Sequence, residues 1–509
     1  MKKTHSLRRR NIKNFQHFFI LFPTYFFFWI PPPLLMTILS TSTTDSSGTP
    51  VQLRVVDDIY LYIESSQNEI IEKYELKHIY GIDKEQDKTL IHYCHIIDPQ
   101  QEQKEGENND KTITNFRTAG IKLWEQRTLK FQGTLDDAFI NGFRQLIVPN
   151  QNDDVRVSVI INPAAGGRQA PVHWETIVKP MLLAAGFNAS QFQITQTLPN
   201  GKTRGLAKQL GIQMLKDKKK TIILCLGGDG TTHDVVNGLS DAFIGFEWQE
   251  EEQRYSVPTF QLGIIPSGSG NSFSLSLKFE SIEHSVLQVI KGQTQPFRLI
   301  DVTLDPDPAV KEKGAKAPKR RILVVMSWGF HAQLVSKSRY LQPFMGNTRF
   351  SWVAMYLLLF LQQHEGELTM IDAERYDPTR KEFVHEGQVE LKDKPFTYFL
   401  VANQDSMERG FKIAPFATPE EETMDIVMMR DVNKEELKAA TIKVLEGGRH
   451  VDDEKNIVEY YKSPELLLRV KHASELCLDG EIVYLAAGGI VRLKMIGPSQ
   501  GEPNFMSFV

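Results

Sequence analysis

The chain has 509 residues, which leaves room for two to four domains. Hydrophobic residues make up 41% and charged residues 24% of it, as in an ordinary globular protein, and the net charge of −4 gives no reason to expect nucleic acid as the main partner. The three cysteines, Cys94, Cys225 and Cys477, include no CxxC pair. Their spacing argues against a zinc site or a disulfide framework and for reduced thiols in a cytosolic setting.

The N-terminal segment combines basic residues with an apolar, aromatic-rich run. Lysines and arginines between Lys2 and Lys13 precede the run from Phe18 to Leu39, which prolines interrupt. This layout fits a dispensable extension, which a start at Met36 would remove, a membrane anchor or a targeting signal. Residues 40–50 are polar and low in complexity, so we expect a disordered linker there and an N-terminal extension over 1–50 as a whole.

Residues 51–150 are expected to form a β-rich module. Short strand-like runs alternate with polar turns, and a helical pattern over Thr134–Leu146 closes the segment. Several strands followed by one helix fit a small β domain, of which a pleckstrin-homology-like module is one example.

Residues 151–298 alternate apolar strand-like runs with helical patterns, which predicts a parallel α/β sheet with ligands at the carboxyl ends of its strands. From residue 299 onward strands dominate, so we expect a β-sandwich-like second domain over 299–509. One helix-length run, Trp352–Leu361, is apolar on all sides. It is either a core helix or a wall for a lipid tail, and the core is the expected place.

Three glycine-rich turns each follow a predicted strand of the α/β domain. They are NPAAGG at 162–167, GGDGTTHD at Gly227–Asp234 and PSGSGNS at 266–272. Since the strands are parallel, the turns should converge at one edge of the sheet, where backbone N–H groups and helix N-termini hold phosphate. Asp229 adds a carboxylate that would repel phosphate unless a metal or a proton transfer uses it. The combination indicates phosphoryl transfer.

Together with LDGE at Leu478–Glu481, these motifs resemble the catalytic domain shared by diacylglycerol, sphingosine and ceramide kinases, over about residues 154–495. The resemblance implies an NAD-kinase/diacylglycerol-kinase-like α/β nucleotide-binding domain followed by a β-sandwich-like domain. It also implies an ATP-dependent lipid kinase that uses Mg²⁺, with Asp229 as the general base for a primary hydroxyl and Asp479 at the metal. The chain has no GxxxxGK[ST] motif, which disfavours a P-loop kinase.

The resemblance further implies which residues contact the nucleotide. They are Asn162, Gly166, Gly167, Thr197, Asn200, Gly228, Gly230, Ser267, Gly268, Ser269, Arg349, Asp479, Gly480 and Glu481. Asn271 is expected to support the third turn, and Arg339 is a second arginine for phosphate. His233 is expected to pack or hydrogen-bond locally rather than to catalyse, and Asp234 to hold its loop or assist a metal.

The lipid acceptor is where the resemblance breaks. Sphingosine kinases carry acidic residues just after a WGF-like turn, whereas SWGFHAQLV places Gln333 and Val335 at those positions. The ammonium group of a sphingoid base favours a carboxylate, so a standard sphingosine site is not expected. Gln333 could still hydrogen-bond a hydroxyl or an amide, and SWGF, which contains Trp328, resembles the sphingosine and ceramide branch. We therefore expect a sphingoid-type acceptor with Gln333 and Trp328 at the substrate, and diacylglycerol as the alternative.

Two other function classes stay open. An NAD kinase shares GGDGT and a related fold, and a catalytically inactive lipid-binding scaffold would keep the fold without turnover. Asp229 and the DGE sequence speak against the scaffold. The expected partners are a lipid substrate and a membrane surface, with no nucleic acid. The expected location is cytoplasmic and peripheral to the membrane, with the N-terminal segment as a candidate anchor.

Overall fold

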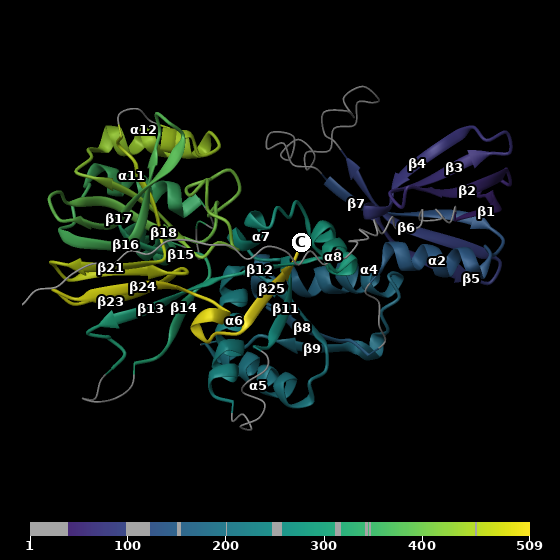
Figure 1. The fold of residues 1–509 in the computed structure, drawn as a ribbon, viewed down its shortest axis with the longest axis horizontal. Helices are drawn as coiled ribbons and strands as arrows, with labels where there is room; N and C mark the ends of the chain where they lie inside the picture. Colours follow the sequence, from purple (N-terminus) through teal and green to yellow (C-terminus); the bar gives the residue numbers. More distant parts are fainter. Residues whose placement is uncertain are drawn as a thin grey trace, which may run out of the picture. The chain divides into compact units, whose positions relative to one another are not determined.

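Figure 1 shows the fold in a computed structural model of the chain. The described residues are 39–97, 123–149, 154–199, 201–246, 257–310, 317–341, 345, 348–452 and 456–509. The interpretations of residues 1–38 as an extension, an anchor or a targeting signal lie outside these ranges. Within them, no helix combines the length and the apolar composition that a membrane span requires.

The N-terminal part forms a seven-stranded antiparallel sheet in the order β4-β3-β2-β1-β7-β6-β5, closed by helix α2 (Asp137–Ile147). The strands are β1 (Ser40–Asp45), β2 (Pro50–Val56), β3 (Tyr60–Ser65), β4 (Ile70–Glu75), β5 (Ile79–Glu85), β6 (Lys88–Ile97) and β7 (Leu123–Gln132). Asp136 caps the N-terminus of helix α2, because its carboxylate accepts from the N–H of Ala138, and the helix buries Phe139 and Phe143. The β-rich module is confirmed, and its pleckstrin-homology-like character stays a prediction.

The expectation of a disordered linker over residues 40–50 is wrong. Ser40–Asp45 form β1, which pairs with both β2 and β7. The turn into β2 is fastened by the Asp45 carboxylate, which accepts from the backbone N–H groups of Ser47 (2.9 Å) and Thr49 (2.8 Å). Low complexity does not exclude a strand here, because alternating Ser and Thr suit a pleated strand, in which β-branched threonine packs well.

The α/β domain has a sheet in the order β12-β25-β11-β10-β8-β9. Its strands are β8 (Arg156–Ile161), β9 (Phe192–Gln196), β10 (Thr221–Gly227), β11 (Thr259–Pro266), β12 (Thr294–Phe297) and β25 (Asn504–Phe508). Its main helices are α4 (Lys179–Ala184), α5 (Lys202–Asp217), α6 (Asp229–Ile244), α7 (Ser272–Ser276) and α8 (Ile282–Lys291). Strands β9, β8, β10 and β11 run parallel, as predicted, and β25 is parallel to β11 as well.

The C-terminal strand β25 corrects the expected domain boundary. It lies in the α/β sheet, parallel to β11, although it follows the whole second domain in the sequence. Residues 504–508 therefore belong to the nucleotide-binding domain and not to the β-sandwich-like one. Sequence spacing gave no sign of this, since a returning strand shows only its own apolar run.

The second domain is built from antiparallel strands in the order β14-β13-β24-β21-β16-β20-β19-β18-β15-β22-β23, with β17 beside β16. Its strands are β13 (Leu299–Asp305), β14 (Arg320–Ile322), β15 (Val325–Gly329), β16 (Gly366–Asp377), β17 (Glu382–Leu391), β18 (Phe396–Ala402), β19 (Met424–Arg430), β20 (Glu459–Ser463), β21 (Glu465–Val470), β22 (Ser474–Leu478), β23 (Glu481–Leu485) and β24 (Ile490–Ile496). Its main helices are α9 (Phe330–Ser338), α11 (Arg349–Leu359) and α12 (Lys434–Leu445).

Helix α11 does not lie in the core, contrary to expectation. Val353 and Leu357 are buried, whereas Trp352 and Tyr356 are 56% and 54% exposed and Leu359 is 68% exposed. The helix thus buries one narrow face and presents a broad apolar face to the surroundings. An all-round apolar sequence does not distinguish these situations, because burial depends on what packs against each face.

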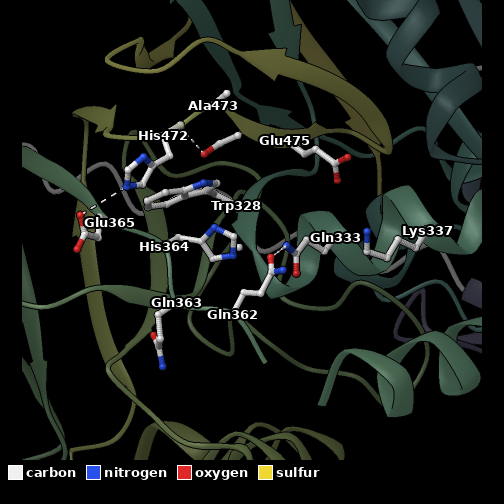
Figure 2. A pocket seen from close by; sticks show the side chains of 12 residues that line it. Trp328, Gln333, Lys337, Gln362, Gln363, His364, Glu365, His472, Ala473 and Glu475 are labelled. Carbon is white, nitrogen blue, oxygen red and sulfur yellow. Dashed lines mark hydrogen bonds and ion pairs between the residues drawn. The ribbon is translucent and has the colours of Figure 1, made fainter. Parts of the chain in front are cut away.

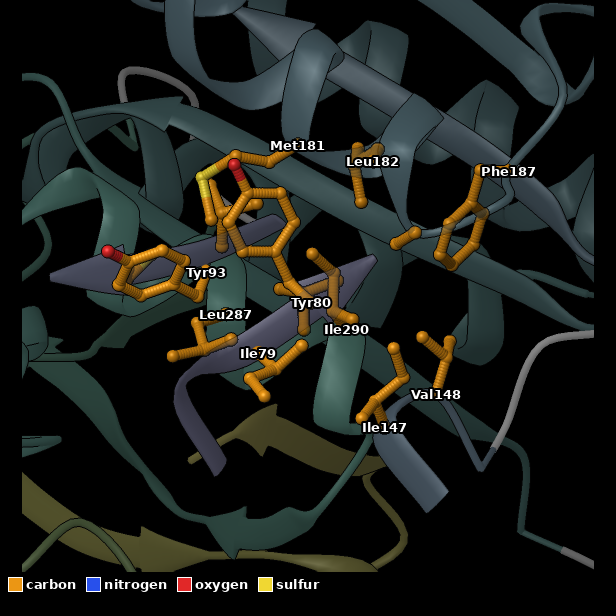
Figure 3. Packing of buried hydrophobic residues seen from close by; sticks show 14 of the residues in the cluster. Ile79, Tyr80, Tyr93, Ile147, Val148, Met181, Leu182, Phe187, Leu287 and Ile290 are labelled. Atoms are coloured by element: carbon orange, nitrogen blue, oxygen red, sulfur yellow. The ribbon is translucent and has the colours of Figure 1, made fainter. Parts of the chain in front are cut away.

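One hydrophobic core joins the N-terminal sheet to the α/β domain. Figure 3 shows Tyr80 and Tyr93 of the sheet beside Met181 of α4 and Leu287 and Ile290 of α8. Contact is close enough that a Cβ on Gly81 would lie 2.2 Å from the carbonyl oxygen of Ala184, so only glycine fits there.

Candidate active site

The three glycine-rich loops meet at one edge of the α/β sheet, as predicted. They follow β8, β10 and β11, which are neighbours in the sheet. The first loop is fastened to α6 by Asn162, whose side-chain Nδ2 donates to Thr231 Oγ1 at 3.0 Å. Asn271 closes the third loop as expected, because its side chain accepts from the N–H of Gly268 (3.1 Å) and donates to the carbonyl of the same residue (2.7 Å).

The loops touch backbone against backbone. A Cβ on Gly268 would lie 2.4 Å from the Cα of Gly228, and one on Gly166 would lie 2.4 Å from the carbonyl oxygen of Ser267. Gly166 also has a positive φ of 54°. A Cβ on Gly167 or Gly230 would meet no atom within 4 Å. By contrast, a Cβ on Gly228 would lie 2.5 Å from the carbonyl oxygen of Gly270. Packing therefore requires glycine at positions 166, 228 and 268, whereas Gly167 and Gly230 leave open space beside the chain that a phosphate group could enter.

Asp229 lies at the first residue of α6 and faces the N-terminus of α7. Its carboxylate accepts from the backbone N–H groups of Ser272 (2.8 Å) and Phe273 (3.0 Å). Burial raises the pKa of Asp229, these two hydrogen bonds lower it, and the charge of Asp479 raises it again, to about 6. The group is thus ionised at neutral pH and basic enough to accept a proton.

An apolar pocket of about 290 Å³ opens beside Asp229. Oδ2 of Asp229 lies 3.6 Å from the Cβ position of Gly270, which lines the pocket. The other lining residues are Ser269, His331, Leu334, Val335, Arg349, Phe350, Met407, Glu408 and Phe411. Met407, Glu408 and Phe411 come from the connection between β18 and β19, and no sequence pattern marked them as part of a site. Glu408 is the one carboxylate among the residues that line this pocket.

His331 is uncharged in this pocket. Its Nδ1 lies 2.7 Å from Oγ of Ser327, and burial lowers the pKa of its imidazole to about 4. Arg349 lies over the ring of Phe350, 4.3 Å from its centroid, and brings a permanent positive charge to the pocket wall.

The DGE turn reaches the nucleotide loops, as the resemblance implied, but Asp479 has another role than the expected metal ligand. Its Oδ1 accepts from the N–H groups of Val324 (2.9 Å) and Val325 (2.8 Å), and its Oδ2 accepts from Leu323 N (2.6 Å) and His233 Nδ1 (2.7 Å). Four donors already occupy a side chain that is 1% exposed. The arrangement gives Asp479 a positioning role and leaves little room for a direct bond to a metal.

Asp234 and Glu481 are the carboxylates near this turn that keep their oxygens available. Burial raises the pKa of Asp234, His233 lowers it and Glu481 raises it, so the two acids are close enough to repel each other. Among the described residues, no cluster of three metal-ligating side chains is present. Arg339 donates to the carbonyl of Gly480 and so fastens the DGE turn.

The other residues expected at the nucleotide differ in burial and in position. Ser269 is exposed at the loop tip, whereas Ser267 is buried and its Oγ lies 3.2 Å from Nδ1 of His173. Thr197 follows β9 and its N–H donates to the carbonyl of Ile161, beside the first loop. Asn200 lies outside the described residues.

Gln333 and Trp328 line a different cavity from Asp229, which corrects their expected place at the acceptor (Figure 2). Gln333 donates to Oε1 of Gln362 at 2.5 Å. The reason is helical geometry, since at 3.6 residues per turn position 333 of α9 faces away from positions 331, 334 and 335. The apolar side chains Leu334 and Val335 take the place beside Asp229 instead.

Comparison with known proteins agrees with this geometry. Residues 156–302 match the family described as "Diacylglycerol kinase catalytic domain", and residues 334–488 match the "YegS C-terminal NAD kinase beta sandwich-like domain". "Putative lipid kinase YtlR" of Bacillus subtilis (strain 168) is 27% identical over 333 residues, which is 64% of this chain and 92% of the relative.

Two further relatives carry more specific names. "Sphingosine kinase 1" of Arabidopsis thaliana is 24% identical over 324 residues, 58% of this chain and 61% of the relative. "Diacylglycerol kinase" of Bacillus subtilis (strain 168) is 25% identical over 341 residues, 66% of this chain and 93% of the relative.

The fold and the loop site define a nucleotide-dependent phosphotransferase with an α/β domain and a β-sandwich-like domain. Residues 156–302 match a diacylglycerol kinase catalytic domain, so the chain is an enzyme of the lipid-kinase type, and its similarity to kinases implies the use of ATP.

Proposed function

We propose that the protein transfers the γ-phosphoryl group of Mg-ATP to the primary hydroxyl of a sphingoid-type lipid, either a long-chain base or a ceramide. The observation that carries the proposal is the position of Asp229. Its Oδ2 lies 3.6 Å from the Cβ position of Gly270, which lines an apolar pocket that could take the lipid. A Cβ on the adjacent Gly230 would meet no atom within 4 Å, so the chain leaves open space there for a phosphate group.

Asp229 would act as the general base. It accepts the proton of the lipid hydroxyl while the hydroxyl oxygen bonds to the γ-phosphorus and the bond from phosphorus to the ADP oxygen breaks. A positioned base contributes on the order of 10²–10⁴-fold to such a step. Most of the remaining acceleration would come from aligning the two substrates and neutralising the phosphate charge.

Mg²⁺ would reach the site with ATP and supply positive charge to the phosphates. Asp234 and Glu481 fit this ion better than Asp479, because their carboxylates are not already filled by four hydrogen-bond donors. Mg²⁺ bound with a nucleotide needs only one or two protein carboxylates, so this pair suffices. Arg349 would add a further positive charge from the pocket wall.

The pocket walls support a long-chain acceptor but do not separate a sphingoid lipid from diacylglycerol, which remains the alternative. Leu334, Val335, Met407 and Phe411 offer apolar contact to any acyl or alkyl chain. Glu408 is the available partner for the ammonium group of a long-chain base. Diacylglycerol and ceramide carry no ammonium group and would not require Glu408.

A membrane surface is the proposed source of the lipid. Helix α11 starts at the pocket residues Arg349 and Phe350 and exposes Trp352, Tyr356 and Leu359 beyond them. Apolar and aromatic side chains on one helix face suit insertion between lipid head groups. A lipid could then pass from the bilayer to the pocket without crossing water.

The deciding experiment measures phosphate transfer by the full chain with Mg²⁺ and labelled ATP in detergent micelles. The acceptors to compare are sphingosine, phytosphingosine, ceramide, diacylglycerol and NAD. Label on a sphingoid lipid or ceramide supports the proposal, and label on diacylglycerol alone replaces it with the alternative. Label on NAD contradicts a lipid acceptor, and ATP binding without any product supports a scaffold.

A further inference from the structure

Three of the side chains that line the apolar pocket beside Asp229 come from one turn of the second domain, in the connection between β18 and β19. They are Met407, Glu408 and Phe411. The turn is closed on itself, because the N–H of Met407 donates to the carbonyl of Phe411 (3.2 Å) and the N–H of Phe411 donates to the carbonyl of Glu408 (3.0 Å). The place of these three side chains relative to Asp229 therefore depends on what fastens the turn to the α/β domain.

Ser272, the first residue of α7, bonds to both sides of this junction. Its backbone N–H donates to Oδ2 of Asp229 at 2.8 Å, and its Oγ donates to the carbonyl of Met407 at 2.6 Å. Ser272 is 3% exposed, so water hardly competes for these bonds. One buried residue thus joins the candidate general base to a wall of the acceptor pocket.

Ser276 fastens the start of the same segment. Positions four residues apart lie on one face of a helix, so Ser276 and Ser272 are neighbours on α7. Ser276 Oγ donates to Oδ1 of Asp405 at 3.1 Å and accepts from the N–H of Asp405 at 3.1 Å. Two serines on one helix face therefore hold residues 405–407.

Two exposed cations complete the junction. Lys278, whose side chain is 70% exposed, pairs with Oδ2 of Asp405 at 2.7 Å, and the exposed Arg409 donates to the carbonyl of Glu280 at 3.2 Å. Because water reaches both cations, their bonds contribute less than the bonds of the buried hydroxyl groups. The serines of α7 are thus the main polar link between the turn and the α/β domain.

We propose that Ser272 is a positioning residue, which sets the place of the acceptor lipid relative to Asp229, and that Ser276 supports it from the next turn of α7. This inference rests on the proposed function, in which Asp229 is the base and the pocket takes the lipid. The third glycine loop leads directly into α7, so one short helix holds the nucleotide loop, the base and the acceptor pocket in register. A displacement of about 1 Å between reacting groups can cost on the order of a hundredfold in rate.

Ser272→Ala tests the proposal, because it removes the bond to Met407 and keeps the backbone N–H that donates to Asp229. The assay measures phosphate transfer by the full chain to sphingosine, ceramide and diacylglycerol in detergent micelles, and the best of the three is the probe. The kcat/KM for that lipid should fall about ten- to a hundredfold. ATP affinity should stay within about twofold, and the acid limb of the pH profile near pH 6 should remain, because the variant keeps both backbone bonds to Asp229.

Ser274→Ala is the matched control. Ser274 is 2% exposed and its Oγ donates to the carbonyl of Asn271 at 2.9 Å. The control therefore also loses one buried hydroxyl bond in α7, but no link to the pocket, and its kcat/KM for the lipid should stay within about threefold. An equal loss in both serine variants would overturn the proposal. A loss of ATP affinity together with turnover in Ser272→Ala would do the same, because Ser272 would then only stabilise the loop.

Hydrogen exchange over residues 405–411 tests the contact without turnover. Exchange at the N–H groups of Met407 and Phe411 should rise in Ser272→Ala and not in Ser274→Ala, and no rise in the first variant would contradict the link. Failure of the proposed function is distinguishable, because Asp229→Asn would then keep near-normal turnover. Loss of turnover in Asp229→Asn, with unchanged kcat/KM in Ser272→Ala, would refute this inference alone.

Discussion

His233 Nδ1 and Asp479 Oδ2 form a hydrogen bond of 2.7 Å, although 246 positions separate the two residues in the sequence. His233 lies one turn after Asp229 on α6, and Asp479 lies in the turn between β22 and β23. The contact therefore joins the two domains directly behind the candidate general base. It explains how the DGE motif near the C-terminus comes to contact the glycine-loop region of the α/β domain.

Asp479→Asn should lower the free energy of unfolding by about 1.5–3 kcal/mol, the range for hydrogen bonds to a charged group. Burial lowers the pKa of His233, but the hydrogen bond and the charge of Asp479 outweigh it, and the net pKa is raised. Because the folded pKa is the higher one, the stability gained from charging His233 is complete below the unfolded value and is lost as pH rises through the folded pKa. Urea unfolding at pH 5.5 and 8.5 should show a smaller difference between variant and wild type at the higher pH. Equal differences at both pH values would mean that the histidine charge plays no part.

Asp229→Asn should lower kcat by about 10²–10⁴-fold while ATP affinity stays within a few-fold, because the amide cannot accept the proton but preserves the size of the side chain. In the wild type, kcat/KM should fall about tenfold per pH unit below pH 6, since the pKa of Asp229 is raised to about 6. The residual activity of the variant should lack this limb of the profile. A variant with near-normal turnover would remove Asp229 from the chemistry.

Gly268→Ala should weaken ATP binding by at least about tenfold. Its Cβ would lie 2.4 Å from the Cα and 2.6 Å from the N of Gly228, and these are backbone atoms that cannot move without opening the loop site. Gly205→Ala on α5 is the matched control, because a Cβ there meets no atom within 4 Å and alanine favours a helix. Calorimetry measures the ATP affinity of both variants. Equal affinity in the two would contradict the tight loop contact.

Trp352→Glu combined with Leu359→Glu should lower binding to lipid vesicles by at least about tenfold, because two large apolar side chains no longer enter the bilayer. Activity on a short-chain acceptor in solution should change little. Leu445→Glu, at a 58% exposed apolar position of α12, controls for added charge. If the control weakens vesicle binding as much as the double variant, α11 is not a specific membrane contact.

Lys291→Met should destabilise the junction between the N-terminal sheet and the α/β domain by about 3 kcal/mol or more. The Lys291 ammonium group donates to the carbonyls of Leu76 (2.8 Å), Ile79 (2.6 Å) and Ile147 (2.9 Å), and methionine would remove this donor from all three. Lys438→Met, at an exposed position, provides the comparison. Thermal unfolding of both variants measures the effect, and hydrogen exchange over β5 and α2 should increase only in the first.

The glycine loops and the alternation of strands and helices were predictable because each depends on local chemistry. Gly166, Gly228 and Gly268 mark places where backbone approaches backbone, and apolar runs such as β10 mark buried parallel strands. Parallel strands bring successive loops to one edge of a sheet, so the convergence around Asp229 also followed from the sequence. The family resemblance rested on the same local motifs.

Other features were decided only by the tertiary structure, because they depend on which surfaces meet. Asp479 is a carboxylate in any reading of the sequence, but four donors from two domains make it a positioning residue. Gln333 and Val335 are two positions apart on α9, yet the helix turns one toward a second cavity and the other toward Asp229. Long-range packing also decides that α11 exposes one face and that β25 joins the sheet of the α/β domain. Such packing has no local signature in a sequence.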